Sequence, residues 1–356
     1  MRRRVLIAAA GALLPAGTAA AQGFSGGGAL TQGFSGAGST FAQPILERWG
    51  HLFAAGEGEG GTMISADSAM DYQPVGSLGG VVRVMQGQVD FGATDVPLPP
   101  ETVAEAGLAQ FPFVSGGVAV AANLAGLGNA TLRLSGALLA EIFLGSVTRW
   151  TDPAIVALNP GLALPDAPIR VVRRADGSGT TWHFASYLAS ASEAWRSRMG
   201  VDQLLPWPVG VGMRGSRALV EALRATPGAI GYVEASQAAR AGLVIAAVDN
   251  RAGAFLRPTP ASIAAGLAGA RWDAARHFHL ALAAPAGAES YPIAATVFAL
   301  LPRRAPARQT RLTLAFFRAS MTERAEVAAA LGFVPLPPAT VAAVEAYWRE
   351  VLPGRA

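Results

Sequence analysis

Short apolar segments alternate with amphipathic segments along most of this chain, from about residue 37 onward. The short segments are typical of strands, and the amphipathic segments repeat apolar residues at helical spacing. Strands that alternate with helices favour an α/β fold with largely parallel sheets. In such sheets, ligands bind at the carboxyl ends of the strands, beside loops that lead into helices. The length of 356 residues exceeds one typical domain and predicts two lobes.

The predicted elements are short and follow one another closely. The predicted strands cover residues 89–93, 117–122, 169–173, 230–233, 243–248 and 296–301. The predicted helices cover residues 42–54, 81–86, 138–143, 181–188, 217–225, 262–267, 310–318, 323–331 and 340–351. No long linker divides the pattern into halves, so we expect the chain to cross between the two lobes more than once.

The first 21 residues have the pattern of an export signal, in which arginines at 2–4 precede an apolar stretch and a small-residue site ends at Ala21. We expect export by the general or the twin-arginine route, with cleavage near Ala21. The product would be a soluble periplasmic protein. The chain has no cysteine to carry a lipid anchor. Residues 22–36 are rich in glycine and repeat the sequence Gln-Gly-Phe-Ser-Gly, which we interpret as a duplication in a flexible leader.

Composition excludes several kinds of site. The lack of cysteine excludes disulfides, thiolate metal sites and a cysteine nucleophile. All 28 basic residues are arginine, so a lysine-dependent phosphate loop is excluded as well. Removal of the three arginines of the signal lowers the net charge from +4 to +1. A nearly neutral protein has no electrostatic footprint for nucleic acid.

Three segments place glycine and hydroxyl side chains directly before a predicted helix. They are Gly-Ala-Gly-Ser-Thr-Phe at 36–41, Gly-Ser-Leu-Gly-Gly at 76–80 and Gly-Ser-Gly-Thr at 177–180. Serine and threonine are ordinary helix caps, so one such segment alone is not specific. The third segment, however, follows a predicted strand that ends in Arg173 and Arg174. Unpaired amides, a helix dipole and a fixed positive charge together predict a site for a tetrahedral oxyanion.

The predicted strand at 89–93 is followed by Asp95, which ends a strand or caps a turn in the simplest interpretation. A second hypothesis makes it a selectivity filter. An ionised carboxylate can only accept hydrogen bonds, so it repels an anion that has no proton to donate. Hydrogen phosphate carries such a proton, whereas sulfate at neutral pH does not. Asp95 would therefore favour a protonated oxyanion through repulsion of the others.

Together, these segments resemble the periplasmic phosphate-binding proteins of phosphate-specific ABC importers. The resemblance rests on residues 36–41, 90–95, 145, 150–153, 158–161, 173–180 and 227–234, which occur in the order of that family. It implies an α/β, two-lobed periplasmic-binding-protein fold with a hinge and a ligand cleft between the lobes. After a signal peptide at 1–21 and a leader at 22–32, residues 33–113 and 292–356 would form lobe 1, and residues 114–291 would form lobe 2.

The resemblance also implies a site for inorganic phosphate and a membrane permease as partner, with no metal, cofactor or nucleic acid and a monomeric protein. The implied ligand contacts are Thr40, Phe41, Ser77, Asp95, Arg174, Ser178, Gly179 and Thr180, with Asp176 orienting Arg174. In that family, Phe41 would donate its amide and Asp95 would accept the phosphate proton. Leu78 stands where the family has a smaller residue, and we expect it to crowd the site and to weaken the Ser77 contact.

Two alternatives to a transport receptor remain open: a periplasmic phosphatase, and a receptor for another protonated oxyanion such as arsenate. A phosphatase needs a nucleophile with a base, or a metal cluster. Of the four histidines, His183 follows Thr180 by one turn and could approach the anion. His277 and His279 would point to one side of a strand, but no acidic cluster flanks them, so we interpret them as a surface pair.

A dinucleotide site is a further possibility, because residues 210–215 fit the pattern G-x-G-x-x-G before a predicted helix. Pro206 and Pro208 interrupt the strand that such a site needs in front of it. We therefore interpret residues 210–215 as a glycine-rich turn.

Overall fold

The computed structural model describes residues 33–55, 70–127, 130–280 and 287–354. The predicted export signal at 1–21 and the leader at 22–32 lie outside these ranges. Helices and strands alternate as predicted, which confirms the α/β class. Within the described ranges, no helix is both long enough and apolar enough to cross a membrane.

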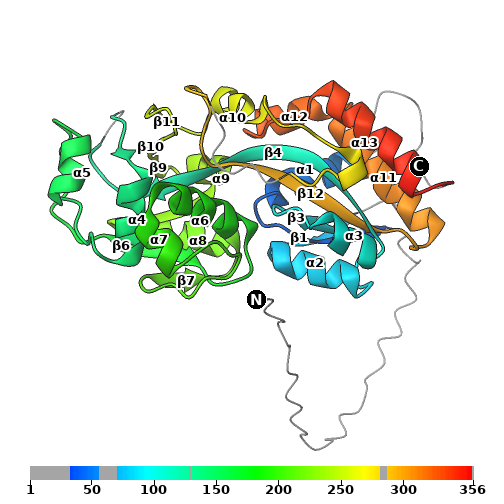
Figure 1. The fold of residues 1–356 in the computed structure, drawn as a ribbon, viewed down its shortest axis with the longest axis horizontal. Coiled ribbons are helices and arrows are strands. Elements are labelled where there is room, and N and C mark those ends of the chain that lie inside the picture. Colours follow the sequence, from blue (N-terminus) through cyan, green and yellow to red (C-terminus); the bar gives the residue numbers. More distant parts are fainter. Residues whose placement is uncertain (1–32, 56–69, 128–129, 281–286, 355–356) are drawn as a thin grey trace, which may run out of the picture. The chain divides into compact units, whose positions relative to one another are not determined.

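Within the described residues, nine strands form one mixed sheet in the order β2-β1-β3-β12-β4-β8-β6-β7, with β9 beside β4 (Figure 1). Their bounds are β1 Phe34–Gly38, β2 Met70–Gln73, β3 Phe91–Thr94, β4 Leu108–Ala122, β6 Arg170–Arg174, β7 Val211–Met213, β8 Ala229–Glu234, β9 Val244–Ile245 and β12 Ala294–Pro302. The strands at each end run parallel, but β12 and β4 run antiparallel to their neighbours. The expectation of largely parallel sheets is therefore wrong for the middle of the sheet.

Strand β4 connects the two halves of this sheet. Its residues 108–117 pair with β12, and its residues 118–122 pair with β8. The sequence predicted only the second half, which is a continuous apolar run, because Gln110, Pro112 and Ser115 interrupt the first half. Pro112 lies where the register between β4 and β12 shifts, and such an irregularity is one place where a strand accepts proline.

Helices cover both faces of each half of the sheet. The larger helices are α1 Gln43–Ala54, α2 Ser77–Met85, α4 Gly136–Leu144, α6 Gly179–Ala191, α8 Gly215–Ala225, α10 Pro260–Leu267, α11 Ala307–Met321 and α13 Pro338–Val351. The six-residue helices are α3 Pro100–Glu105, α5 Pro153–Leu158, α7 Glu193–Arg198, α9 Ala235–Arg240 and α12 Ala325–Ala330. All nine predicted helices are present with shifted ends, and the four that the sequence missed (α3, α5, α7, α9) are six residues long.

A small second sheet contains β5 Arg133–Leu134, β10 Ala247–Asp249 and β11 Phe255–Leu256, and one 3-10 turn covers Ala274–Arg276. Buried aromatic rings fix the strands that carry the candidate site. Phe91 of β3 packs edge-to-face on Phe317, and Tyr232 of β8 stacks on Phe184 at 4.4 Å between ring centroids. Burial of each large apolar side chain stabilises the fold by about 1.5–3 kcal/mol.

The leader prediction for residues 33–36 is wrong. Phe34–Gly38 forms β1, which pairs with both β2 and β3. Phe34 is buried and packs on Phe91 and Phe316. The second copy of the near-repeat thus enters the sheet, whereas the first copy lies outside the described residues.

Candidate functional site

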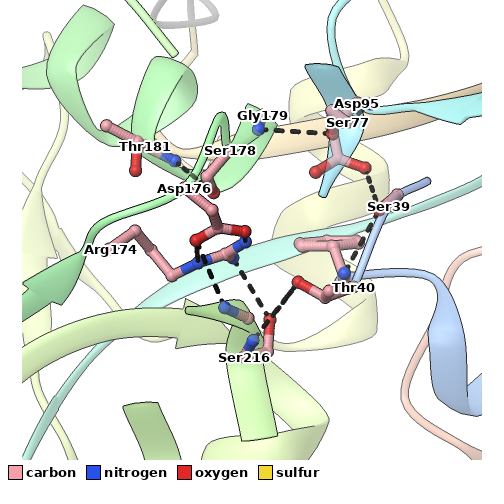
Figure 2. A network of polar contacts seen from close by, with 12 residues as sticks. Ser39, Thr40, Ser77, Asp95, Arg174, Asp176, Ser178, Gly179, Thr181 and Ser216 are labelled. Carbon is pink, nitrogen blue, oxygen red and sulfur yellow. Dashed lines mark hydrogen bonds and ion pairs between the residues drawn. The ribbon is translucent and has the colours of Figure 1, made fainter. Parts of the chain in front are cut away.

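The predicted site residues gather where the carboxyl ends of β1, β3 and β6 meet the starts of helices (Figure 2). Thr40 and Phe41 follow β1, Ser77 begins α2, Asp95 follows β3, Arg174 ends β6, Asp176 lies in the next loop, Ser178 caps α6, and Gly179 and Thr180 begin α6. Apart from Asp176, which is partly exposed, all of them are buried. The structure therefore brings all nine together.

Asp95 is a buried carboxyl group that forms no ion pair with an arginine of the described residues. It is 1% exposed, and its Oδ1 atom accepts a hydrogen bond from the Ser39 hydroxyl. Burial raises the pKa of Asp95 to about 6, although the Ser39 bond and the charge of Arg174 act to lower it. Asp95 is consequently ionised in weakly alkaline solution and protonated below about pH 6.

Ser39 was missed by the sequence analysis, although it lies inside the segment that drew attention to Thr40. Its Oγ atom accepts hydrogen bonds from the amides of Phe41, at 3.1 Å, and Ala42, at 3.2 Å. The Phe41 amide, which the resemblance assigned to an anion, is therefore engaged by a side chain in this structure. The available signal was a hydroxyl residue at position 39, directly before a predicted helix. Sequence alone does not show that this hydroxyl faces Asp95.

Arg174 is held by Asp176 through two bonds. Its Nε donates to Oδ1 of Asp176 at 2.7 Å, and its Nη2 pairs with Oδ2. Two-pronged pairing of this kind fixes the plane of the guanidinium as well as its position. Burial acts to raise the pKa of Asp176, but the bonds and the charge of Arg174 outweigh it, so that this pKa is lowered. The remaining nitrogen, Nη1, donates to Ser216 Oγ at 3.5 Å.

Ser216 is a second residue that the sequence analysis missed. It lies in the first turn of α8, where polar groups again gather at the start of a helix. Its Oγ lies 2.8 Å from Thr40 Oγ1, and its amide donates to the same Thr40 oxygen at 3.3 Å. The interpretation of 210–215 as a glycine-rich turn is wrong, because β7 and then α8 form there. No strand forms at residues 201–210, as Pro206 and Pro208 predicted, and β7 begins only at Val211, inside the glycine pattern. A glycine and a serine before a helix were the available signal.

Ser77 joins the segment that carries Asp95 to the segment that carries Arg174. Its Oγ accepts bonds from the amides of Asp95 and Gly179, each at 3.3 Å. A Cβ atom on Gly179 would lie 2.5 Å from Asp95 Cβ, so only glycine allows this approach. Leu78 is 42% exposed and packs against Gly177. Whether Leu78 crowds a bound anion stays a prediction, since its side chain lies against the loop that carries Ser178.

Neighbouring hydroxyls at the start of α6 have different surroundings. Ser178 caps the helix by accepting the Thr181 amide at 3.2 Å, and the Thr181 hydroxyl lies 2.8 Å from that of Tyr232. The hydroxyl of Thr180 is buried and has no hydrogen-bond partner among the described residues. Buried hydroxyls nearly always have a partner, so Thr180 fits a site that receives a polar ligand.

The histidines do not supply an evident catalytic base. Nε2 of His183 lies 2.8 Å from the Asp95 carbonyl oxygen, and this contact requires the nitrogen to carry the proton. Burial lowers the pKa of His183 to about 4, so the ring is neutral. His277 has a left-handed backbone (φ 52°) and pairs with Tyr347, so the predicted strand at 277–279 is wrong. The described part of the chain contains no group of three histidine or acidic residues placed to hold a metal ion.

Comparisons with known proteins agree with this architecture. A family model described as a PBP superfamily domain matches residues 16–318. The phosphate-binding protein PstS of Xylella fastidiosa is 38% identical over 311 residues, which cover 87% of this chain and 83% of that protein. The phosphate-binding protein PstS of Haemophilus influenzae is 36% identical over 315 residues, which cover 88% of this chain and 92% of that protein.

One similar solved structure is that of a high affinity periplasmic phosphate-binding protein (PfluDING) bound with phosphate. It has a TM-score of 0.71 and 23% sequence identity, and the match covers 88% of this chain and 93% of that one. The predicted two-lobed periplasmic-binding-protein fold is confirmed. The chain belongs to the PBP superfamily and, within it, to the PstS phosphate-binding proteins.

Proposed function

We propose that this protein binds inorganic phosphate, in the form of hydrogen phosphate, between Asp95 and Arg174 and delivers it to the membrane permease of an ABC importer. The observation that carries the proposal is the pairing of a buried, oriented arginine with a buried carboxylate at one cluster of helix starts. The names of the relatives, which are phosphate-binding proteins, support the same ligand.

Arg174 supplies the positive charge and Asp95 supplies the selection. The guanidinium and the helix starts attract any oxyanion, since both act on negative charge alone. Asp95 accepts the proton of hydrogen phosphate while it is ionised. Sulfate has no proton to give, so its binding would leave two negative groups in contact in a buried place. The proposal therefore needs no base, nucleophile or metal ion.

The remaining contacts come from hydroxyls and amides. Thr180 offers a hydroxyl that has no other partner in the described residues. Thr40, Ser77 and Ser178 offer hydroxyl protons, and Phe41 and Gly179 offer amides that now donate to Ser39 and Ser77. Phosphate would share or replace these protein-to-protein bonds.

We propose a binding rather than a catalytic role. Hydrolysis of a phosphate ester needs a positioned nucleophile or an activated water. His183 donates its Nε2 proton to a carbonyl group, and burial lowers its pKa to about 4, so the ring is a weak base. The relatives are named for binding and not for a reaction.

We further propose export, a periplasmic location and a monomeric state without affinity for nucleic acid. Export would use residues 1–21, with cleavage near Ala21. A solved neighbour is described as periplasmic, which supports the location. The proposed lobe 1 contains residues 33–113 and 292–356, and lobe 2 contains residues 114–291. The change of partner along β4, from β12 to β8, supports a boundary near residue 114.

Calorimetric titration of the protein, stripped of bound anions, with phosphate and then with sulfate at about pH 8 tests the proposal. We expect tight one-to-one binding of phosphate and no heat from sulfate. An equal response to both anions, or none to phosphate, would refute the proposed function. A parallel titration with arsenate measures how far selection extends among protonated oxyanions.

A further inference from the structure

The hydroxyl of Ser39 lies between the start of α1 and the carboxylate of Asp95 (Figure 2). We propose that Ser39 is a positioning residue, which dictates the oxygen of Asp95 that accepts the anion's proton and sets the pH range over which sulfate is excluded. This inference rests on the proposed function, since it concerns the same site.

The direction of the Ser39 proton follows from its partners. A serine hydroxyl has one proton and two lone pairs. The amides of Phe41 and Ala42 both donate to Ser39 Oγ, and they occupy its lone pairs. The single proton must then go to Asp95 Oδ1, the remaining partner of this hydroxyl.

Asp95 Oδ1 is thus committed to accepting a bond from the protein. The other oxygen, Oδ2, faces the start of α6, because a Cβ atom on Gly179 would lie 2.7 Å from it. The Ser77 hydroxyl also contacts the Asp95 carboxylate and lies beside this point at Gly179. Oδ2, which Ser39 leaves unbound, is therefore the oxygen that can accept a proton from an anion bound beside Gly179 and Thr180. The amides at the start of α1 also strengthen the bond from Ser39 to Asp95, since a hydroxyl that accepts hydrogen bonds from a helix start becomes a stronger donor.

The other charged or titratable groups near Asp95 keep one charge state across the useful pH range. They are Arg174 from β6, His183 from α6 and Tyr72 from β2. Burial holds the pKa of His183 at about 4 and raises that of Tyr72 well above its ordinary value, so both stay neutral. Arginine stays charged throughout. Asp95 is the member of this group that titrates in weakly acidic solution.

Sulfate can bind without repulsion only when Asp95 carries a proton. Its association constant should be level below the midpoint of the Asp95 titration and fall about tenfold per pH unit above it. Loss of the Ser39 bond removes a contact that favours the ionised form, so the midpoint should rise. A bond to a charged group is strong enough to move it by about one pH unit or more.

The test is calorimetry with sulfate between about pH 5 and pH 9 on the wild type, Ser39→Ala and Ser35→Ala, with phosphate at about pH 8 as reference. Ser35→Ala is the matched control, because Ser35 lies on β1, the strand that Ser39 follows, and likewise donates its hydroxyl to an aspartate, Asp90, at 3.0 Å. Ser39→Thr keeps the hydroxyl and provides a rescue variant.

We expect a midpoint about one pH unit higher in Ser39→Ala, with wild-type midpoints in Ser35→Ala and Ser39→Thr. Near pH 8, Ser39→Ala should bind sulfate about tenfold more tightly than the wild type. A wild-type midpoint in a folded Ser39→Ala protein would overturn the inference while phosphate binding by the wild type still supports the proposed function. Absence of phosphate binding by the wild type would overturn both.

Discussion

Each of the two sides of the candidate site contains an aspartate, and the two aspartates have opposite electrostatic surroundings. On one side, Asp95 is buried with the hydroxyls of Ser39 and Ser77 as its direct partners, and its pKa is raised by burial. On the other side, Asp176 is paired with Arg174, and its pKa is lowered. The second side is nearly balanced in charge before any anion arrives. The first side is not balanced, and this difference is what allows a single carboxylate to distinguish anions by their protons.

The largest expected effect comes from the charged side. Arg174→Met keeps much of the side-chain volume but leaves Asp176 without its partner, so we expect phosphate affinity to fall about a thousandfold. Arg173→Met is the matched control, because Arg173 is the adjacent strand residue and is not among the predicted contacts. Calorimetry at about pH 8 measures both variants. An Arg174→Met protein with wild-type phosphate affinity would show that Arg174 does not contact the anion.

The next effect concerns selection on the other side. Asn has the shape of Asp but can donate a hydrogen bond, so Asp95→Asn should bind sulfate about a hundredfold more tightly than the wild type at about pH 8. Asp90→Asn changes an aspartate that pairs with Ser35 instead, and it should leave sulfate binding unchanged. Equal sulfate affinities in all three proteins would contradict the filter.

Stability against pH should separate the two aspartates. The pKa of Asp95 rises from 3.8 to about 6 on folding, so its stabilising contribution is present at low pH and is lost as pH rises through about 6. The loss amounts to about 3 kcal/mol. Asp176 behaves in the opposite way, because its lowered pKa contributes stability above the ordinary aspartate pKa that is lost in stronger acid.

Chemical unfolding at about pH 5 and pH 8 compares the variants. Asp95→Asn should be more stable than the wild type at the higher pH, whereas Asp176→Asn should be less stable by about 3 kcal/mol because Arg174 loses its partner. Glu234, whose pKa burial raises to about 7, adds a slope of the same sign as Asp95 in every protein. If Asp95→Asn and Asp176→Asn changed the free energy of unfolding equally at the higher pH, the two aspartates would not have the opposite surroundings described above.

The smallest expected effect separates two adjacent threonines. Thr180→Val removes a hydroxyl that has no partner in the described residues, so phosphate affinity should fall about tenfold with little change in folding stability. Thr181→Val removes a hydroxyl that pairs with Tyr232, so it should lower the free energy of unfolding by about 1 kcal/mol and spare phosphate affinity. Thermal unfolding and calorimetry on both variants measure the two effects. A loss of stability in Thr180→Val together with a loss of phosphate affinity in Thr181→Val would contradict the expectation.

Much of the fold was predictable because local pattern determines it. Helices such as Gln43–Ala54 and Pro338–Val351 repeat apolar residues at helical spacing and begin or end within two residues of the prediction. The first half of β4 was not predictable, since Gln110, Pro112 and Ser115 interrupt its apolar run and its burial on both faces leaves no alternating signal. Its antiparallel pairing with β12 joins segments about 180 residues apart.

The candidate site shows the same limit. Glycine and hydroxyl residues before helices identified the segments of Thr40, Ser77 and Thr180, because that chemistry is local. Ser39 and Ser216 could not be recognised, since their partners lie 56 and 176 residues away along the chain. The surroundings of Leu78 were not predictable for the same reason: sequence places it beside Ser77 but does not show that its side chain packs on Gly177 and is partly exposed.

The most direct test of the two-sided site is a crystal structure of the protein grown with phosphate at about pH 8, at a resolution that shows hydrogen-bond lengths. We expect one tetrahedral anion that contacts the Arg174 guanidinium and the Thr180 hydroxyl, with one of its oxygens at hydrogen-bond distance from Asp95 Oδ2. A phosphate bound elsewhere, or one that touches Arg174 but leaves Asp95 out of contact, would contradict it.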